Sequence, residues 1–133
     1  MSLRYELNPG ISAGEIASLR HQVGWESREK ELAELVGCTY MTAACFEDDL
    51  LVGFVDVLSD GVEDALIRSL VVHPDYRRRG IALNLLKMVT ERIKKSNIKT
   101  TNVLFEPELT DLYRKAGFRI VGGGLIDNER EGF

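Results

Sequence analysis

The stretch that decides the fold of this 133-residue chain reads His73-Pro74-Asp75-Tyr76-Arg77-Arg78-Arg79-Gly80-Ile81-Ala82. It follows Leu66–Val72, an apolar run whose β-branched content is typical of a buried strand. After it, apolar residues recur at helical spacing as far as Ile93, which predicts an amphipathic helix. The quoted stretch is therefore a turn that joins a strand to a helix, with Pro74 ending the strand.

The chemistry of this turn favours a ligand that carries phosphate. Gly80 lacks a Cβ, so it can take positive φ or let a ligand approach its backbone. The first turn of a helix presents N–H groups without intrahelical partners, and its dipole attracts anions. Arg77, Arg78 and Arg79 add positive charge. A solvated basic turn is the alternative, because most short charge runs are exposed.

The turn resembles the acyl-CoA-binding motif of the GNAT superfamily of N-acetyltransferases. In that motif an Arg or Gln, two residues, a Gly, one residue and a Gly or Ala cradle a pyrophosphate, and the matching positions here are Arg77, Gly80 and Ala82. A second stretch, Leu112–Phe118, is similar to the family's L-Y-x-K-x-G-F element. The two motifs occur in the expected order, and the resemblance covers Val52 to Val121.

The resemblance implies an α/β fold, also classed as α+β, and an acetyl-CoA site within it. The expected sheet is mixed and mostly antiparallel, with helices on both faces and a splayed pair of parallel strands at the site. One splayed strand would offer main-chain groups of Leu70, Val71 and Val72 to the pantetheine arm, and one freed N–H would stabilise the oxyanion. The expected phosphate-binding residues are Arg77, Arg78, Arg79, Gly80, Ile81, Ala82 and Leu83. Which arginine contacts which phosphate stays open.

Tyr113 is the candidate catalytic residue. Its spacing from Leu109 and Ala116 places it on an apolar stripe of a short helix, so a packing role is one interpretation. The resemblance implies instead that the Tyr113 hydroxyl protonates the departing CoA thiolate. A phenol with a pKa of about 10 is protonated at neutral pH and can donate to a thiolate whose conjugate acid has a pKa of about 8.5.

The general base and the acceptor pocket are less defined. Candidate bases are His21, Glu26, Asp56, Glu63, Asp64 and His73, although each suits an ordinary surface position and a water chain could also remove the proton. We expect the acceptor pocket between the N-terminal helices and the splayed strands, with Trp25 near its wall. A packing plug between the helices is the alternative role for Trp25. The neighbouring Glu26 would favour a cationic amine.

Composition narrows the class of protein. A hydrophobic fraction of 44% and a charged fraction of 29% suit one soluble domain over residues 1–133. The formal net charge of −4 argues against a general nucleic-acid binder. The sequence contains no apolar run of about eighteen residues, which a membrane-spanning helix would need. Cys38 and Cys45 lack metal-ligand spacing, so no metal site is expected. Their fit to reduced thiols and a start without a signal-peptide core favour a cytoplasmic protein.

Local patterns predict the remaining elements. The first part of the chain should form a strand over 3–8, a helix opened by a Ser12–Glu15 capping box and a second helix that ends at Gly37. Hairpin strands should follow over 39–46 and 50–58, with a bulge or close approach at Gly53. After the helix over 81–96 we expect a parallel strand over 101–105, a short helix from Pro107 to Gly117, a strand over 118–121 and a last edge strand within 125–133.

The residues and the resemblance together predict an acetyl-CoA-dependent N-acetyltransferase. The acetyl group would pass to a primary amine of a small molecule or peptide by direct attack, without a covalent enzyme intermediate. The alternative is a non-catalytic acyl-CoA-binding module with a regulatory or partner-docking role. The expected partners are acetyl-CoA and an amine acceptor, with neither nucleic acid nor membrane, and a homodimer is left open.

Overall fold

The computed structural model describes residues 2–129 and is built around one five-stranded sheet. Its strands are β1 (Leu3–Leu7), β2 (Met41–Glu47), β3 (Leu50–Ser59), β4 (Asp64–Val72) and β5 (Thr100–Val103), in the spatial order β1-β2-β3-β4-β5. Neighbouring strands from β1 to β4 are antiparallel, and β4 and β5 are parallel. The sheet is therefore mixed and mostly antiparallel, as predicted.

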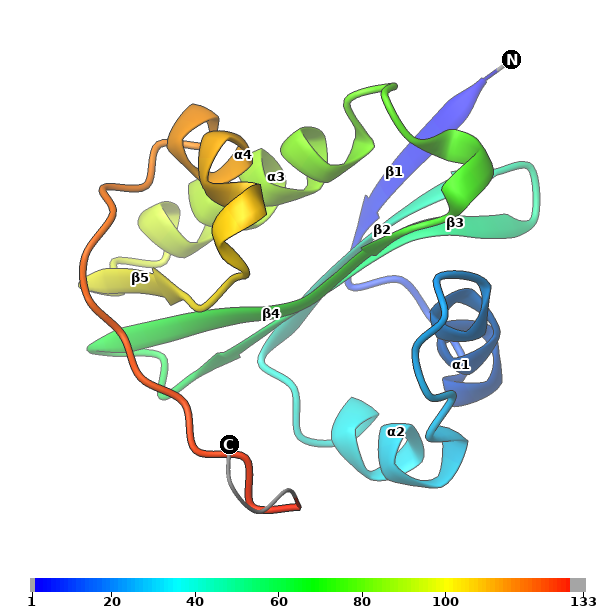
Figure 1. Cartoon of the computed structure of the whole chain (residues 1–133), viewed down its shortest axis with the longest axis horizontal. Helices are drawn as coiled ribbons and strands as arrows, with labels where there is room; N and C mark the ends of the chain where they lie inside the picture. The colour runs from blue at the N-terminus through cyan, green and yellow to red at the C-terminus, as the bar shows by residue number, and fades with distance from the viewer. Residues whose placement is uncertain (1, 130–133) are drawn as a thin grey trace.

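Helices cover both faces of this sheet (Figure 1). The helices α1 (Ala13–Gln22) and α2 (Glu29–Val36) lie on one face, and α3 (Ile81–Lys95) and α4 (Thr110–Lys115) lie on the other. Two short 3-10 turns, η1 (Pro74–Tyr76) and η2 (Pro107–Leu109), precede α3 and α4. The predicted fold class is confirmed. None of the described helices is long and apolar enough to cross a membrane.

Each face of the sheet has its own apolar core. The core beneath α3 contains fully buried residues of the sheet and the helix, including Val55, Val57, Ile67, Leu85, Leu86 and Val89. The core beneath α1 and α2 includes Ile16, Leu19, Phe54 and Val71. At Gly53 the sheet and α3 come so close that a Cβ would lie 2.7 Å from Cγ2 of Ile81. The close approach predicted at this strand glycine is confirmed.

Local capping signals place the helix ends. The Ser12 hydroxyl accepts the N–H of Glu15 at 3.1 Å, and the Glu15 carboxylate accepts the N–H of Ser12 at 3.2 Å, which is the predicted capping box. Gly37 ends α2, as predicted. Gly80, at φ 77°, is the N-cap of α3. These ends depend on residues close in sequence, which is why the sequence alone located them.

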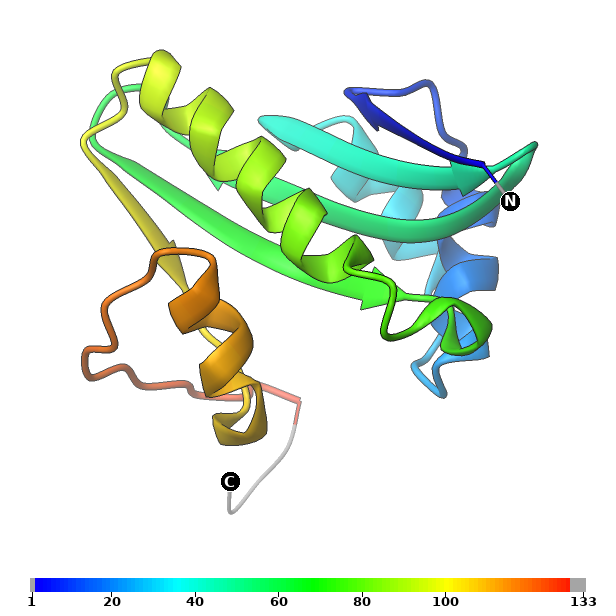
Figure 2. The ribbon, with the colours of Figure 1, turned by 90° about the horizontal axis from the view of Figure 1, so that it is seen from above.

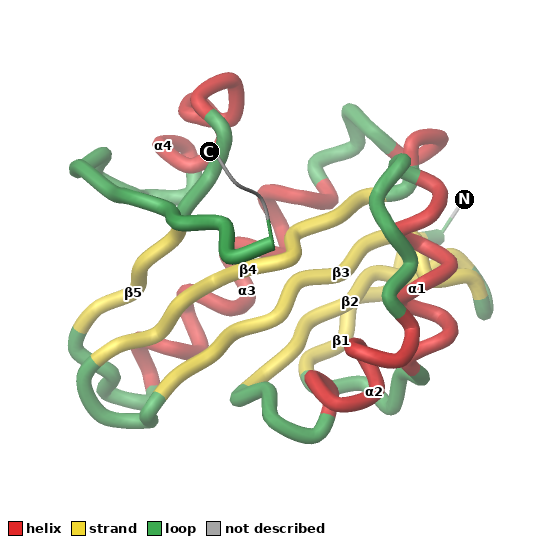
Figure 3. Tube along the Cα trace, turned by 60° about the horizontal axis from the view of Figure 1, so that its bottom comes forward, coloured by secondary structure: helices red, strands yellow, loops and turns green. Residues whose placement is uncertain are grey.

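The chain after α4 departs from the prediction. The strand predicted over 118–121 is wrong, and none of the described residues from 118 to 129 lies in a strand. This tail runs past β5 and across β4 toward the face that carries α1 and α2 (Figures 1 and 3). Its residue Glu129 pairs with Arg28 at 3.3 Å.

Residues 118–121 have no neighbouring strand to pair with in the described part of the chain. The glycines that follow at 122–124 also disfavour a strand, because glycine offers no side chain to pack and loses much backbone entropy when ordered. The edge strand predicted within 125–133 is absent from 125–129, and residues 130–133 lie outside the described part of the chain.

Candidate active site

The strand β4 contains a bulge part-way along its pairing with β3. Asp56 of β3 lies opposite Arg68. Two residues earlier in β3, Phe54 lies opposite Val71, so β4 holds one extra residue over this interval. Ser69 has a φ of 59°, in the left-handed region that residues other than glycine seldom occupy. An extra residue in a ladder bends its strand, so the backbone of β4 changes direction after Arg68.

On its other edge, β4 has a strand partner over less than half of its length. The parallel pairs run from Asp64 opposite Thr100 to Ile67 opposite Val103. Within residues 2–129, no strand pairs with 68–72 on this edge. Figure 2 shows β5 turning away from β4 in this region. The predicted splayed parallel pair is confirmed. Main-chain groups along this edge of β4 have no neighbouring strand, among the described residues, with which to form hydrogen bonds.

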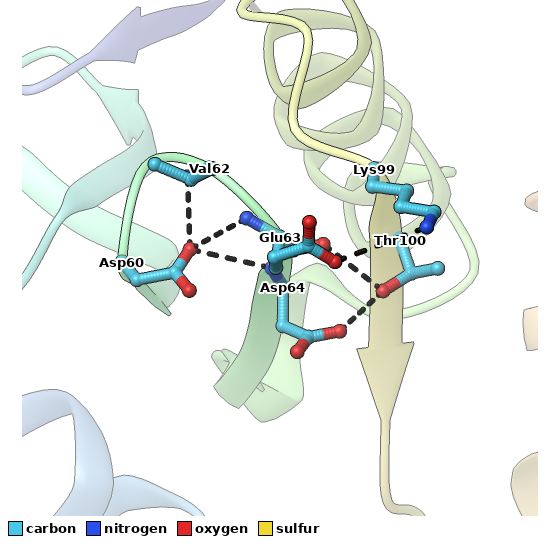
Figure 4. Close-up of polar contacts among 6 residues, drawn as sticks. All are labelled: Asp60, Val62, Glu63, Asp64, Lys99 and Thr100. Carbon is cyan, nitrogen blue, oxygen red and sulfur yellow. Dashed lines mark hydrogen bonds and ion pairs between the residues drawn. The ribbon is translucent and has the colours of Figure 1, made fainter.

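Polar contacts fasten the opposite end of the pair, where both strands begin (Figure 4). The Asp60 carboxylate accepts the N–H groups of Val62 at 2.8 Å and Glu63 at 2.9 Å, and these bonds lower the pKa of Asp60. The Thr100 hydroxyl donates to the Glu63 carbonyl at 3.2 Å and to the Asp64 carboxylate. The two strands are therefore held together at their start and separate only at their ends.

A cleft of about 1110 Å³ occupies the divergence of the strands. Its walls come from β4, from β5 and the loop that follows it, from α4 and from the tail. Trp25, Leu70 and Tyr113 line it. Val71 and Val72 do not, because Val71 packs beneath α1 and α2 and Val72 packs toward the core beneath α3.

Tyr113 combines a packed ring with an uncommitted hydroxyl. The residue is 3% exposed, and its ring stacks on Phe105 with centroids 4.4 Å apart and meets Phe118 edge-on at 5.7 Å. Within residues 2–129 its hydroxyl forms no hydrogen bond. Burial raises the pKa of the phenol above its ordinary value. Tyr113 thus has the packing role that its spacing predicts, and its O–H has no acceptor among the described residues.

The arginine-rich turn lies beyond the end of β4, outside the cleft lining. The Tyr76 hydroxyl donates to Glu47, and the Asp75 N–H donates to His73 Nδ1 at 3.1 Å, so the start of the turn is anchored to the sheet. No side chain caps α3 at Gly80. A Cβ on Gly80 would meet nothing within 4 Å. There is therefore room for a ligand beside Gly80, and the first N–H groups of α3 have no side-chain cap.

The three arginines of the turn have different surroundings. Arg77 and Arg78 are exposed, and Arg78 takes a φ of 63°. Arg79 places its guanidinium 4.9 Å from the centre of the Tyr76 ring and donates to the Asp75 carbonyl at 3.3 Å. Arg79 is therefore engaged within the turn, which leaves Arg77 and Arg78 as the side chains with more freedom to reach a phosphate.

Comparison with known proteins identifies the family. Residues 10–129 match the model of the acetyltransferase (GNAT) domain. The chain belongs to the GNAT family. It is 25% identical over 116 residues to an uncharacterized N-acetyltransferase, ycf52, of Gracilaria tenuistipitata var. liui, and the match covers 84% of this chain and 64% of that protein. Its identity to the Pyropia yezoensis protein of the same name is 28%, with 84% and 67% covered.

A solved structure supports the same fold. A GNAT-family acetyltransferase of Streptococcus pneumoniae TIGR4 superposes with a TM-score of 0.82 over 96% of this chain and 99% of that one, at 21% identity. At this identity the likeness concerns the fold alone. The match to the curated relatives is partial, because this chain covers 64% of the length of the Gracilaria protein.

None of the side chains considered as a general base lines the GNAT cleft. Asp56 is 6% exposed and pairs with Arg68 at 2.9 Å, while Glu63 and Asp64 belong to the fastened end of the parallel pair. Glu106 is the one carboxylate among the described residues that line the cleft. Within residues 2–129, no three His, Cys, Asp or Glu side chains are grouped so that they could hold a metal ion.

Sequence reasoning assigned no role in this site to Arg68, Ser69 or Glu106. All three line the cleft. Arg68 and Ser69 had a recognisable signal, because they are two polar residues inside an otherwise apolar strand. The sequence marks Glu106 only as a departure from the asparagine that the family often has at this position. Its place in the cleft depends on how the loop after β5 folds against the rest of the domain.

Proposed function

We propose that this chain is an acetyl-CoA-dependent N-acetyltransferase that acetylates a primary amine. The observation that carries the proposal is the separation of β5 from β4 next to the bulge at Ser69. It leaves a cleft with unpaired main-chain groups of β4 on one wall and Tyr113 on another. Membership of the GNAT family adds support from outside the geometry.

The residues of the chain fit each part of an acyl-CoA molecule. N–H groups from Gly80 to Leu83, at the open start of α3, would hold the pyrophosphate, assisted by the exposed Arg77 and Arg78. Main-chain groups of 70–72 would pair with the pantetheine arm, as an added strand pairs with an exposed sheet edge. When bound, acetyl-CoA supplies the acetyl group as a thioester.

The chemistry assigned to this chain is direct transfer. The acceptor nitrogen forms a bond to the thioester carbonyl carbon, and the carbon–sulfur bond breaks. A main-chain N–H of the unpaired edge of β4 donates to the carbonyl oxygen as it gains negative charge. The Tyr113 hydroxyl gives its proton to the leaving thiolate and is reprotonated from solvent. The amine loses its proton to Glu106 or to water in the cleft.

The competing function is that of a non-catalytic acyl-CoA-binding module. Calorimetric titration with acetyl-CoA, followed by an assay of free thiol released in the presence of mixed amines, separates the two. Binding with amine-dependent thiol release supports the enzyme. Binding without release for any amine indicates the module, and absence of binding contradicts both.

A further inference from the structure

The cleft carries a charged side chain that the proposed chemistry leaves without a role. Arg68 lies on the cleft wall, directly before the bulge. Its neighbour Ile67 packs in the core beneath α3, so Arg68 belongs to the opposite face of the sheet, the one that carries α1 and α2. Trp25, in the connection between α1 and α2, lines the same cleft.

The Asp56 carboxylate fixes the position of the Arg68 guanidinium. The two residues are cross-strand partners, and Arg68 Nε lies 2.9 Å from Asp56 Oδ2. Asp56 is 6% exposed and does not line the cleft. The Thr39 hydroxyl also approaches the same Asp56 oxygen, at 3.5 Å. A guanidinium fixed by a buried carboxylate presents its remaining donors in a defined direction, because the group is planar and rigid.

The hydrogen bonding of this pair is incomplete. Arg68 Nη2 and Asp56 Oδ1 are buried and have no hydrogen-bond partner among the described residues. These two atoms are sealed from the cleft, but 28% of the Arg68 side chain is exposed, so other atoms of it can be reached by a ligand. The Asp56 carboxylate occupies only the Nε position of the guanidinium. The terminal nitrogens are the ones that bind the two oxygens of a carboxylate or phosphate.

The surroundings of Trp25 do not suit a cationic acceptor. The Arg20 guanidinium lies 5.1 Å from the centre of the indole ring and donates to the Glu26 carbonyl at 2.9 Å. A protein cation therefore already covers a face of the indole, and Glu26 does not line the cleft. Burial lowers the pKa of Arg20, and the neighbouring Arg28 adds to this effect. These arginines favour an anionic group over a second cation at this end of the cleft.

We propose that the acceptor amine carries an oxyanion, a carboxylate or a phosphate, which Arg68 binds while Asp56 fixes the guanidinium. This inference rests on the proposed acetyltransferase function and names the class of its acceptor. The plainer role is a cross-strand ion pair that only stabilises the sheet. In that role, loss of Arg68 would affect all acceptors alike.

Matched pairs of acceptors provide the test. The carboxylate arm compares amino acids with their carboxamides, and the phosphate arm compares amino-sugar phosphates with the parent amino sugars. Within each pair the anionic group also changes the pKa of the amine, so kcat/KM is expressed per unprotonated amine. The ratio of the two values then does not depend on how much of the enzyme is folded. A charge-assisted hydrogen bond predicts a preference of about tenfold to a hundredfold for the anionic member in the wild type.

The variants are chosen to separate recognition from stability. Arg68→Gln should bring the ratio close to one, with acetyl-CoA affinity retained. Because this variant leaves Asp56 buried without its partner, the double variant Asp56→Asn with Arg68→Gln repeats the test in a neutral pair. Arg92→Gln, which removes an exposed arginine near the other end of α3, should keep the wild-type ratio.

A wild-type ratio near one or below it, in both arms, overturns the inference and leaves the acetyltransferase proposal intact. An unchanged ratio in both Arg68 variants also overturns it. Two other results contradict the proposed function itself, and the inference with it. They are binding of acetyl-CoA without turnover of any amine, which indicates the non-catalytic module, and failure to bind acetyl-CoA.

Discussion

The two edges of β4 serve different purposes. Toward β3 the ladder extends from Ala65 to Val72, and the bulge at Ser69 is its only irregularity. Side chains along that ladder, such as Val55, Val57 and Ile67, are no more than 1% exposed. Toward β5 the ladder stops at Ile67, and a cleft takes its place. One strand thus completes the core on one edge and leaves its backbone available for binding on the other.

The stability of the protein should be more sensitive to added side-chain volume at the paired edge of β4, where β3 lies against it, than at the edge that faces the cleft. Gly53→Val would place its Cβ 2.7 Å from Cγ2 of Ile81 and 3.1 Å from Cδ1 of Leu85. We expect the free energy of unfolding to fall by about 3 kcal/mol, because a close-packed core must shift to admit the side chain. Chemical denaturation measures this change.

Gly10→Val is the matched control, because a Cβ there meets nothing within 4 Å. It should cost less than about 1 kcal/mol. An equally small loss for Gly53→Val would mean that α3 lies farther from the sheet than the structure places it.

At the edge of β4 that faces the cleft, the expected effect is on the catalytic rate. Tyr113→Phe keeps the ring between Phe105 and Phe118 and removes only the hydroxyl. General acid catalysis typically contributes 10²–10⁴-fold, so kcat should fall by about a hundredfold while acetyl-CoA affinity is retained. Stability should change by less than about 1 kcal/mol, since the hydroxyl has no hydrogen-bond partner to lose among residues 2–129.

Steady-state kinetics and thermal unfolding are measured together on this variant. Tyr40→Phe, at a residue that is 41% exposed, is the control and should retain its rate. If Tyr113→Phe keeps full activity, Tyr113 is a packing residue only.

A pair of glycines tests the turn that continues from β4. Gly80 and Gly61 have almost the same φ, 77° and 78°, so an alanine at either position should cost a similar strain of about 1–2 kcal/mol. Only Gly80 lies where phosphates would approach the start of α3. Gly80→Ala should therefore weaken acetyl-CoA binding by about tenfold in calorimetry, and Gly61→Ala should leave it unchanged. Equal affinities would exclude the turn as a contact.

The smallest expected effect concerns pH. Burial raises the pKa of Tyr113, so the phenol keeps its proton beyond its ordinary pKa of about 10. The ratio of wild-type kcat to that of Tyr113→Phe should therefore stay constant from neutral pH up to about pH 9.5. A ratio that collapses well below that pH would mean that the phenol ionises early and does not act as the acid.

The sequence predicted those features of β4 and its surroundings that depend on local residues or on family motifs. The turn from β4 to α3 was predictable because Pro74 and Gly80 act locally. The family, the mixed sheet and the splayed pair followed from two motifs and are confirmed. The roles of Tyr113 and of the arginines in catalysis and binding remain predictions.

The bulge at Ser69 could not be predicted, because it depends on the register between β3 and β4 and no local residue sets that register. The strand expected over 118–121 failed for a related reason. Its apolar residues suit a strand, yet the tail joins no ladder in the described structure, and Val121 is 70% exposed. Strand formation depends on a neighbour as much as on composition.

Residue-resolved hydrogen–deuterium exchange, with and without saturating acetyl-CoA, tests the central claim that the open edge of β4 receives the co-substrate. We predict slower exchange at amides within 69–72 and 80–83, where the unpaired edge and the start of α3 would gain partners. Amides of the fastened turn at 62–64 should be unaffected. Unchanged exchange along 69–72, or protection confined to another part of the chain, would contradict the account.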